Sequence, residues 1–326
     1  MPSPSHRYEF RSADVLRLLG GSLLPVVGFA LAMHAGARWS WWPKPRPALD
    51  TERTVLLHQA DAARDPGHAD VVLVGDSSCL MNVSARRLGE KLARPVLNLA
   101  TFSFLDLNAH RLLLEEFNRH HPTPPRAIVL LMHPEALRRL DSEPYYLAAL
   151  TNYLAGSDQT RTDPTAGEVL GVEICRGRLL ARALPAPLGG AYGRRYGFSP
   201  DLEAFMKAER GSLIDPEPQP FSGVPEYRLA PTLEKASRAF RSALRPGVRL
   251  WVGMTPVPQG FAGADYPARR DQLLRAWGEW LGASVLLSEL PATLPDSAFV
   301  RTTHLREEAA GDYTDRLATL LKPATQ

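Results

Sequence analysis

Short, uninterrupted apolar runs constrain the fold of this chain more than any other feature of its sequence. The run VVLV at residues 71–74 and the run AIVLLM at 127–132 would place no polar side chain on either face of a strand. This pattern is typical of strands buried on both faces, because a strand with one wet face alternates apolar and polar residues. Stretches with helical patterning separate the runs. Strands that alternate with helices favour a parallel sheet with helices on both faces.

The full pattern predicts an α/β fold, a three-layer sandwich around a central parallel sheet. An interruption at about 135–228 predicts a large, mostly helical insertion, with helical stretches at 144–155 and 166–184 followed by Pro- and Gly-rich pieces. We interpret this insertion as a lid or partner surface, or as a plain structural subdomain. The predicted strands are 71–74, 96–99, 127–132, 248–254 and 284–287, and the predicted helices are 51–65, 84–93, 105–118, 229–244, 266–281 and 307–322.

Length, charge and cysteine content limit the function classes. The 326 residues fit about two domains, or one α/β domain with insertions. A formal net charge of +3, without a basic stripe and interleaved aromatic residues, argues against nucleic acid as a partner. Cys79 and Cys175 allow one disulfide at most and no four-thiolate zinc site. His120, His121 and His133 fit a loop and the strand after it better than a metal site, so we expect no metal and no cofactor.

The first 42 residues are predicted to be a short tail and a membrane anchor. Between Arg17 and Arg38 lie twenty residues (18–37) without an acidic or strongly basic side chain. As a helix they would span about 30 Å, the thickness of one hydrocarbon core. Three tryptophans follow within residues 39–42, as an interfacial aromatic belt would. The sequence therefore predicts one transmembrane helix and membrane attachment through it.

Two other interpretations of this segment stay open. Residues 35–37 (Ala-Gly-Ala) have the small-x-small form of a signal-peptide cleavage site. The segment also fits a buried or interfacial helix of a soluble protein. Three basic residues flank it on each side, so charge does not set its orientation. Residues 43–69 are predicted to be a Pro-rich linker and a helix, and 70–326 the main domain.

Polar residues at the predicted strand ends are the candidates for chemistry, since sites in doubly wound sheets form at the carboxyl ends of strands. Ser77 follows the first strand on a tight turn into a helix, where a nucleophile is exposed next to backbone N–H donors. Asp76 before it fits a capping residue better than a catalytic one. His133 ends the third strand and is weighed between a structural role and a substrate or oxyanion role. His304 precedes the last helix and is the expected general base.

These residues lie in motifs that resemble a known superfamily. VVLVGDSSCL (71–80) resembles block I of the SGNH (GDSL-type) hydrolases, with Ser77 in the nucleophile position. NLAT (98–101) resembles block II, and FVRTTHLREEAAGDYTDRLA (299–318) resembles block V, whose histidine precedes the final helix. One N-terminal span before such a domain looks like the membrane-anchored proteins of polysaccharide O-acetylation and teichoic-acid D-alanylation. In those proteins a stretch like MHPEAL (132–137) replaces the usual block III.

The resemblance implies a flavodoxin-like SGNH fold and a serine esterase or O-acyltransferase. Ser77 would attack an ester carbonyl, His304 would take its proton, and the N–H groups of Ser77 and Ala100 would hold the oxyanion, with Asn98 supporting. The substrate would be an envelope polysaccharide or another acyl ester. A multi-spanning membrane acyltransferase would be a partner, and the domain would lie outside the cytoplasm, in the periplasm or at the cell surface.

Two departures from the family pattern leave a second hypothesis open. Arg301 stands three residues before the histidine, where the family has the aspartate that orients it. Ala100 replaces the block II glycine. A Ser–His dyad would still work, or Asp296, Glu307 or Glu308 would take the place of the aspartate. The alternative is a catalytically degenerate module that binds glycan or scaffolds a membrane acyltransfer complex.

Overall fold

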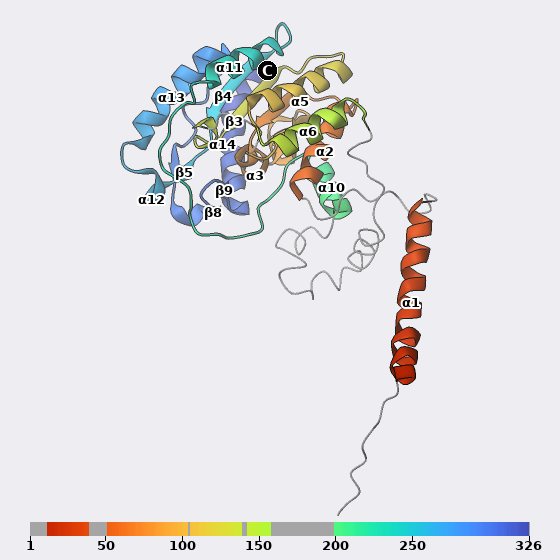
Figure 1. Ribbon diagram of the computed structural model, residues 1–326. Coiled ribbons are helices and arrows are strands. Elements are labelled where there is room, and N and C mark those ends of the chain that lie inside the picture. Colours follow the sequence, from red (N-terminus) through yellow and green to blue (C-terminus); the bar gives the residue numbers. More distant parts are fainter. Residues whose placement is uncertain (1–11, 39–50, 104, 139–141, 158–198, 326) are drawn as a thin grey trace, which may run out of the picture.

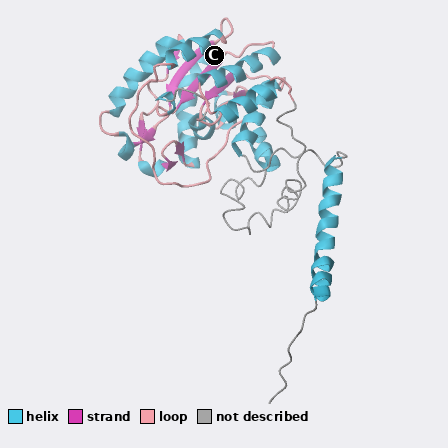
Figure 2. Ribbon diagram, viewed as in Figure 1, coloured by secondary structure: helices cyan, strands magenta, loops and turns pink. Residues whose placement is uncertain are grey.

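A central parallel sheet organises the chain. The computed structural model of the protein describes residues 12–38, 51–103, 105–138, 142–157 and 199–325. All five predicted strands form, in the order β2-β1-β3-β4-β6, and every neighbouring pair is parallel. Helices pack around this sheet (Figures 1 and 2). The predicted α/β class and parallel sheet are thereby confirmed. The strands are β1 (Val71–Gly75), β2 (Val96–Asn98), β3 (Ala127–Met132), β4 (Arg249–Met254) and β6 (Val285–Leu286).

Alternate residues of each strand point into two different apolar layers. Leu73 and its register partner Val129 pack in one core cluster with α3, α4 and α14, whereas Val72 and Ile128 pack in another with α5, α11 and α13. This explains the uninterrupted apolar runs, because both faces of the sheet are covered. The helices are α3 (Ser77–Asn82), α4 (Ala85–Leu92), α5 (Leu107–His120), α11 (Leu233–Ser242), α13 (Tyr266–Leu281) and α14 (Glu307–Thr325).

Further elements pack around these layers. Helix α2 (Thr51–Arg64) forms a third apolar cluster with α5 and with α6 (Pro144–Leu154). The predicted helix at 166–184 lies outside the described residues. Helix α3 was not predicted, because its six residues follow β1 without an intervening loop. The remaining elements are α10 (Ser199–Ala208), α12 (Gln259–Ala262), the 3₁₀ turns Ala136–Arg138 and Asp296–Ala298, and the pairs β5/β7 (Val257–Pro258, Thr293–Leu294) and β8/β9 (Phe299–Arg301, His304–Leu305).

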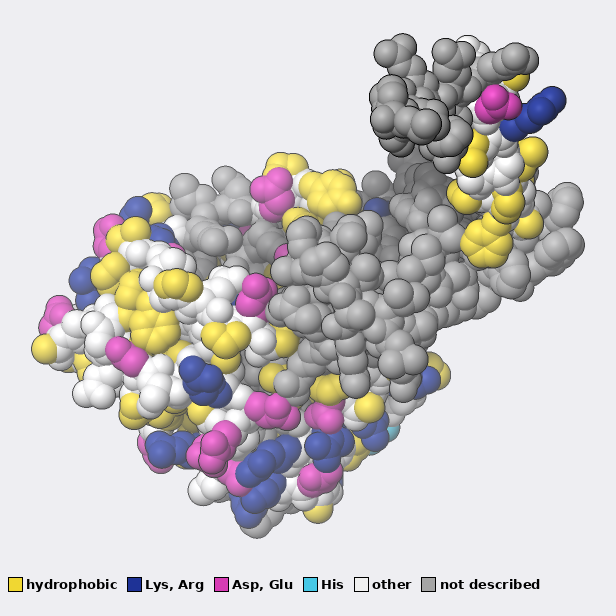
Figure 3. Space-filling view, turned by 90° about the horizontal axis from the view of Figure 1, so that it is seen from below, with side chains coloured by type: hydrophobic (Ala, Val, Ile, Leu, Met, Phe, Trp, Pro, Cys, Tyr) yellow, Lys and Arg dark blue, Asp and Glu magenta, His cyan; other side chains and the backbone are white. Residues whose placement is uncertain are grey.

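The N-terminal segment is a single helix, α1 (Ser12–Arg38), of 27 residues. It starts earlier than predicted and includes the whole uncharged stretch. Leu18 and Leu24 are 73% and 72% exposed, and Figure 3 shows the apolar side chains of this helix uncovered. By length and composition, α1 is long and apolar enough to cross a membrane.

The strand order places the topological switch point of the sheet next to the motif that contains Ser77. When only the strands of this sheet are counted along the chain, β6 is the fifth and the order is 2-1-3-4-5. The direction of winding therefore reverses between β1 and β3. Ligands of doubly wound sheets bind outside the carboxyl ends of the strands at this switch point. Ser77 lies two residues after the end of β1, and His133 directly follows β3.

Candidate active site

Three side chains form a hydrogen-bonded chain at the carboxyl end of β1. Ser77 Oγ lies 2.9 Å from His304 Nε2, and His304 Nδ1 lies 2.5 Å from Asp215 Oδ2. Ser77 is 6% exposed and His304 5% exposed, while the side chain of Asp215 is fully buried. These residues come from α3, β9 and the segment between α10 and α11, and are brought together from 89 to 227 positions apart.

The direction of the two hydrogen bonds follows from which groups can donate and which can accept. An ionised carboxylate can only accept, so His304 Nδ1 carries the proton and Nε2 is free to accept the Ser77 O–H. Burial raises the pKa of Asp215, but its hydrogen bond from His304, the charges of His304 and Arg301 and the Glu217 N–H outweigh this and lower the pKa. Asp215 is therefore ionised at neutral pH. The arrangement is that of a nucleophile, a general base and an orienting acid.

The turn that carries Ser77 is built by its two preceding residues. A Cβ on Gly75 would lie 1.8 Å from the Leu131 carbonyl oxygen, so only glycine fits where β1 leaves the sheet. Asp76 caps α3, because its Oδ1 accepts from the Ser78 N–H at 3.0 Å. Ser77 thus becomes the first residue of a helix, and its N–H has no acceptor inside that helix.

Asp76 also joins the turn to the neighbouring strands. Its Oδ2 accepts the His133 N–H at 3.0 Å, and its Oδ1 accepts the Ser78 hydroxyl at 2.5 Å. Thr255, after β4, donates in turn to Ser78 Oγ at 2.8 Å. Burial raises the pKa of Asp76, although its hydrogen bonds counter the shift. The contacts agree with the capping role expected for Asp76 and hold the ends of β1, β3 and β4 in one network.

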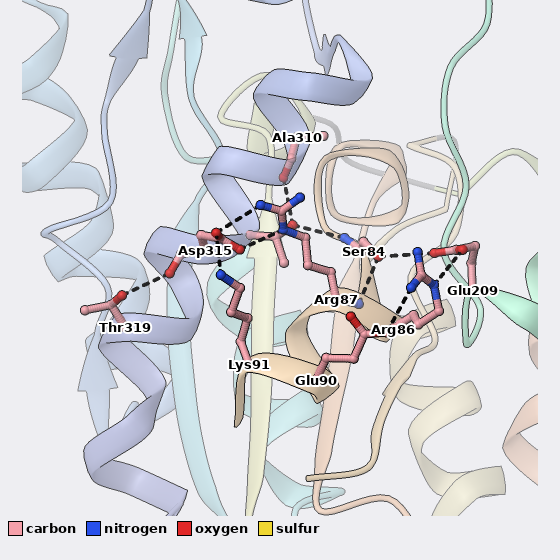
Figure 4. A network of polar contacts seen from close by, with 10 residues as sticks. Ser84, Arg86, Arg87, Glu90, Lys91, Glu209, Ala310, Asp315 and Thr319 are labelled. Carbon is pink, nitrogen blue, oxygen red and sulfur yellow. Dashed lines mark hydrogen bonds and ion pairs between the residues drawn. The ribbon is translucent and has the colours of Figure 1, made fainter. Parts of the chain in front are cut away.

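Asp215 reaches the site on a segment, residues 210–215, which we call the acid strap; it is buried at 211–213 and 215, whereas Arg210 is exposed. Arg210 O accepts the Asn98 N–H at 2.8 Å, and the Leu213 N–H donates to Leu80 O at 3.0 Å. Gly211, at φ +91°, lies so close to β2 that a Cβ would be 2.0 Å from Asn98 O. Glu209, just before the strap, accepts from Arg86 of α4 and from Ser84, the N-cap of that helix (Figure 4). The end of the predicted insertion is therefore packed into the domain core.

Asn98 and Ala100 are engaged in holding the strap and the turn after β2. Asn98 Nδ2 donates to Ser212 Oγ at 3.0 Å and to Cys79 O at 3.3 Å, and its Oδ1 accepts the Ala100 N–H at 2.9 Å. Gln59 of α2 donates to Ala100 O at 2.7 Å and to Gly211 O at 3.1 Å. An oxyanion role for the Ala100 N–H stays a prediction. It requires the hydrogen bond from this N–H to Asn98 Oδ1 to break.

Arg301, which stands in the sequence where the family has its aspartate, pairs with the acid of this site. Its guanidinium pairs with Asp215, with Nη2 donating to Oδ1 at 3.0 Å and Nε contacting Oδ2, and Nη2 also donates to Glu217 O at 3.3 Å. The carboxylate thus lies between the two basic groups. Arg301 and His304 thus share Asp215 as a counter-ion.

The residue that supplies the acid beside His304 differs from the ones expected from the sequence. Asp296, Glu307 and Glu308 were the expected substitutes, but Asp215 occupies the position next to His304 Nδ1. Asp296 lies on a 3₁₀ turn, where its Oδ1 accepts the Gly260 N–H at 2.8 Å. Glu307 and Glu308 begin α14, where negative charge is favourable. The apolar pair Leu213–Ile214 directly before Asp215, inside a Pro-rich stretch, is the one sequence signal that a buried segment lies there.

Two other groups singled out by sequence are buried beside this site. His133 is 1% exposed; its Nδ1 accepts the Glu135 N–H at 3.2 Å, and its Nε2 has no partner among the described residues. Burial, and secondarily the charge of His304, lower the pKa of His133 to about 3. Cys79 is buried and forms no disulfide among the described residues, and burial raises the pKa of its thiol well above the usual value. Cys175 lies outside the described residues.

Comparison of this chain with models of protein families, with curated proteins and with solved structures finds no match.

Proposed function

We propose that this protein is an acyl-ester hydrolase or O-acyltransferase that works through an acyl-enzyme on Ser77. The observation that supports this most is the continuous hydrogen-bonded chain from Ser77 through His304 to the buried, ionised Asp215. Ser77 Oγ attacks the ester carbonyl carbon while its proton moves to His304 Nε2. The carbonyl re-forms, the ester C–O bond breaks, and the leaving alcohol takes that proton. Water or a second hydroxyl then repeats the sequence on the acyl-Ser77 ester.

The substrate class and location in this proposal come from the resemblance and from α1. We propose an SGNH-like protein anchored by α1, with its α/β domain in the periplasm or at the cell surface. The acyl acceptor is an envelope polysaccharide, and a multi-spanning membrane acyltransferase supplies acyl groups. The three basic residues on each side of the uncharged segment do not decide between the two orientations.

A direct test uses the full-length chain in detergent with p-nitrophenyl acetate. We expect release of nitrophenol that falls by on the order of 10⁶-fold in Ser77→Ala, since such a substitution removes the nucleophile. Ser242→Ala, an exposed serine on α11, is the matched control and should retain full activity. Added polysaccharide then separates the two activities, because a transferase acetylates the glycan and a hydrolase releases acetate. A folded wild-type chain no faster than Ser77→Ala would favour the glycan-binding or scaffold module.

A further inference from the structure

Two buried polar groups without partners flank the strand that carries the nucleophile. Strand β1 lies between β2 and β3, and Ser77 follows β1. Thr101 follows the end of β2 and His133 follows β3. Thr101 Oγ1 and His133 Nε2 are both buried without a hydrogen-bond partner among the residues that the structure describes. Buried polar groups in folded proteins nearly always have a hydrogen-bond partner, because an unpaired one loses its contacts with water without compensation.

The hydrogen bonding of His133 fixes which ring nitrogen carries the proton. The Glu135 N–H points at Nδ1 from 3.2 Å, and an N–H can only donate. Nδ1 is therefore the unprotonated acceptor, and in a neutral imidazole the proton is on Nε2. The unpaired atom is thus an N–H donor. Such a donor is satisfied by an oxygen of a bound molecule.

His133 is held in place by the same residue that starts the nucleophile helix. Its backbone N–H donates to Asp76 Oδ2, and Asp76 directly precedes Ser77. Its ring is near enough to His304 for the charge of His304 to contribute to its low pKa. His133 is consequently neutral at neutral pH. A neutral donor binds an oxyanion without repelling the imidazolium that forms on His304.

We propose that the Nε2–H of His133 is an oxyanion donor, hydrogen-bonding the substrate carbonyl oxygen as Ser77 attacks it. This inference rests on the proposed acyl transfer at Ser77. It assigns a use to a buried donor that is otherwise unpaired in the described residues. It also supplies a donor where the Ala100 N–H is already bonded to Asn98. Preorganised donors of this kind are worth about 10²–10³-fold in kcat.

The test compares variants of the full-length chain in detergent on p-nitrophenyl acetate. His133→Phe keeps the ring volume and removes the donor, so we expect kcat to fall by about 10²–10³-fold with KM little changed. His133→Gln restores an amide N–H of similar reach and should recover part of the loss. His110→Phe is the matched control: His110 is equally buried, and both its ring nitrogens are unpaired among the described residues. We expect this control to keep wild-type kcat.

A second measurement does not depend on any variant remaining folded. In ¹⁵N-histidine-labelled wild type, the His133 ring should show a protonated Nε2, and that proton should move downfield when benzeneboronic acid forms a tetrahedral adduct on Ser77. Wild type without Ser77-dependent turnover would overturn the proposed function and this inference with it. Normal turnover with His133→Phe within threefold of wild type, or an unmoved Nε2 proton in the adduct, would overturn the inference alone.

Discussion

Asp215 and Asp315 are two aspartates that each pair with two basic side chains, in opposite surroundings. Asp315 on α14 receives Arg87 at 2.7 and 3.0 Å and Lys91 at 2.9 Å, and all three side chains are about a third to a half exposed (Figure 4). Asp215 receives His304 and Arg301 with its side chain fully buried. Both carboxyl groups have a lowered pKa.

The two aspartates differ in the free energy that their ionised side chains lose on leaving water. Exposed ion pairs contribute about 0–1 kcal/mol and are screened by salt. A buried carboxylate loses its hydration, and even a good pair does not always offset that loss. A protein therefore has little reason in stability alone to hold Asp215 where it is. Perturbed, buried groups of this kind are concentrated at functional sites, which supports a catalytic role for Asp215 rather than a structural one.

The largest expected effect comes from Asp215→Asn. An amide at this position no longer stabilises the imidazolium and favours the wrong tautomer of His304, so kcat should fall by about 10⁴-fold. Ester turnover by the purified full-length variant measures this. Asp315→Asn removes the same charge from the surface network and should leave kcat unchanged. Equal losses in the two variants would show that the comparison between them has no catalytic meaning.

A second prediction concerns the acid strap. Gly211→Ala puts a methyl group 2.0 Å from Asn98 O at a φ of +91°, so the strap must move and carry Asp215 with it. A displacement of about 1 Å costs on the order of 10²-fold in rate, and we expect at least that loss of kcat. Gly247→Ala is the matched control, because Gly247 also has a positive φ, +82°, but no atom within 4 Å of the added Cβ. It should cost about 1–2 kcal/mol of stability and no activity. Full activity in Gly211→Ala would mean that the strap does not position the acid.

A third prediction uses pH and salt to separate the two aspartates. Both pKa values lie below the ordinary 3.8, so each carboxylate stabilises the folded state above that pH. The contribution is lost as pH falls through the folded-state pKa, because the unfolded chain then binds the proton first. Titration followed by carboxyl ¹³C NMR should show the Asp315 pKa rising toward 3.8 in about 1 M salt, while that of buried Asp215 changes little. The same salt shift at both sites would contradict the difference in burial.

The smallest expected effect is on stability at the surface network. Asp315→Asn should lower the free energy of unfolding by less than about 1 kcal/mol at low salt, because Arg87 and Lys91 stay solvated without it. Urea unfolding at low and high salt checks this, and the difference from wild type should shrink as salt is added. A loss of several kcal/mol that is independent of salt would make this network a structural element in its own right.

The sheet could be predicted because its signal is local. The run at 127–132 coincides with β3 residue for residue, and the run at 71–74 falls one residue short of the end of β1. Burial on both faces leaves a pattern that needs no knowledge of the partners. Ser77 and His304 were singled out for the same reason, since each lies next to a recognisable element. The structure brings them within hydrogen-bond distance, and their catalytic roles stay predictions.

Asp215 could not be found in the same way. It lies 89 residues before His304 in a Pro-rich stretch that has no period of its own. What holds it is the bonding of residues 210–213 to Asn98, Leu80 and Gln59, which involves contacts far apart in the chain. The sequence instead drew attention to Arg301, which is next to the site but pairs with the acid. Local patterns predict where strands end. Which segment supplies the acid beside His304 depends on long-range packing.

Intact-mass measurement of the full-length chain with an activated acetyl ester tests the proposed acyl-enzyme. Wild type quenched in acid should carry one added acetyl group, located at Ser77 by peptide mapping. The adduct should be absent in Ser77→Ala and should form much more slowly in Asp215→Asn. An unmodified wild-type chain, or an acetyl group that persists in Ser77→Ala, would contradict nucleophilic acyl transfer at this site.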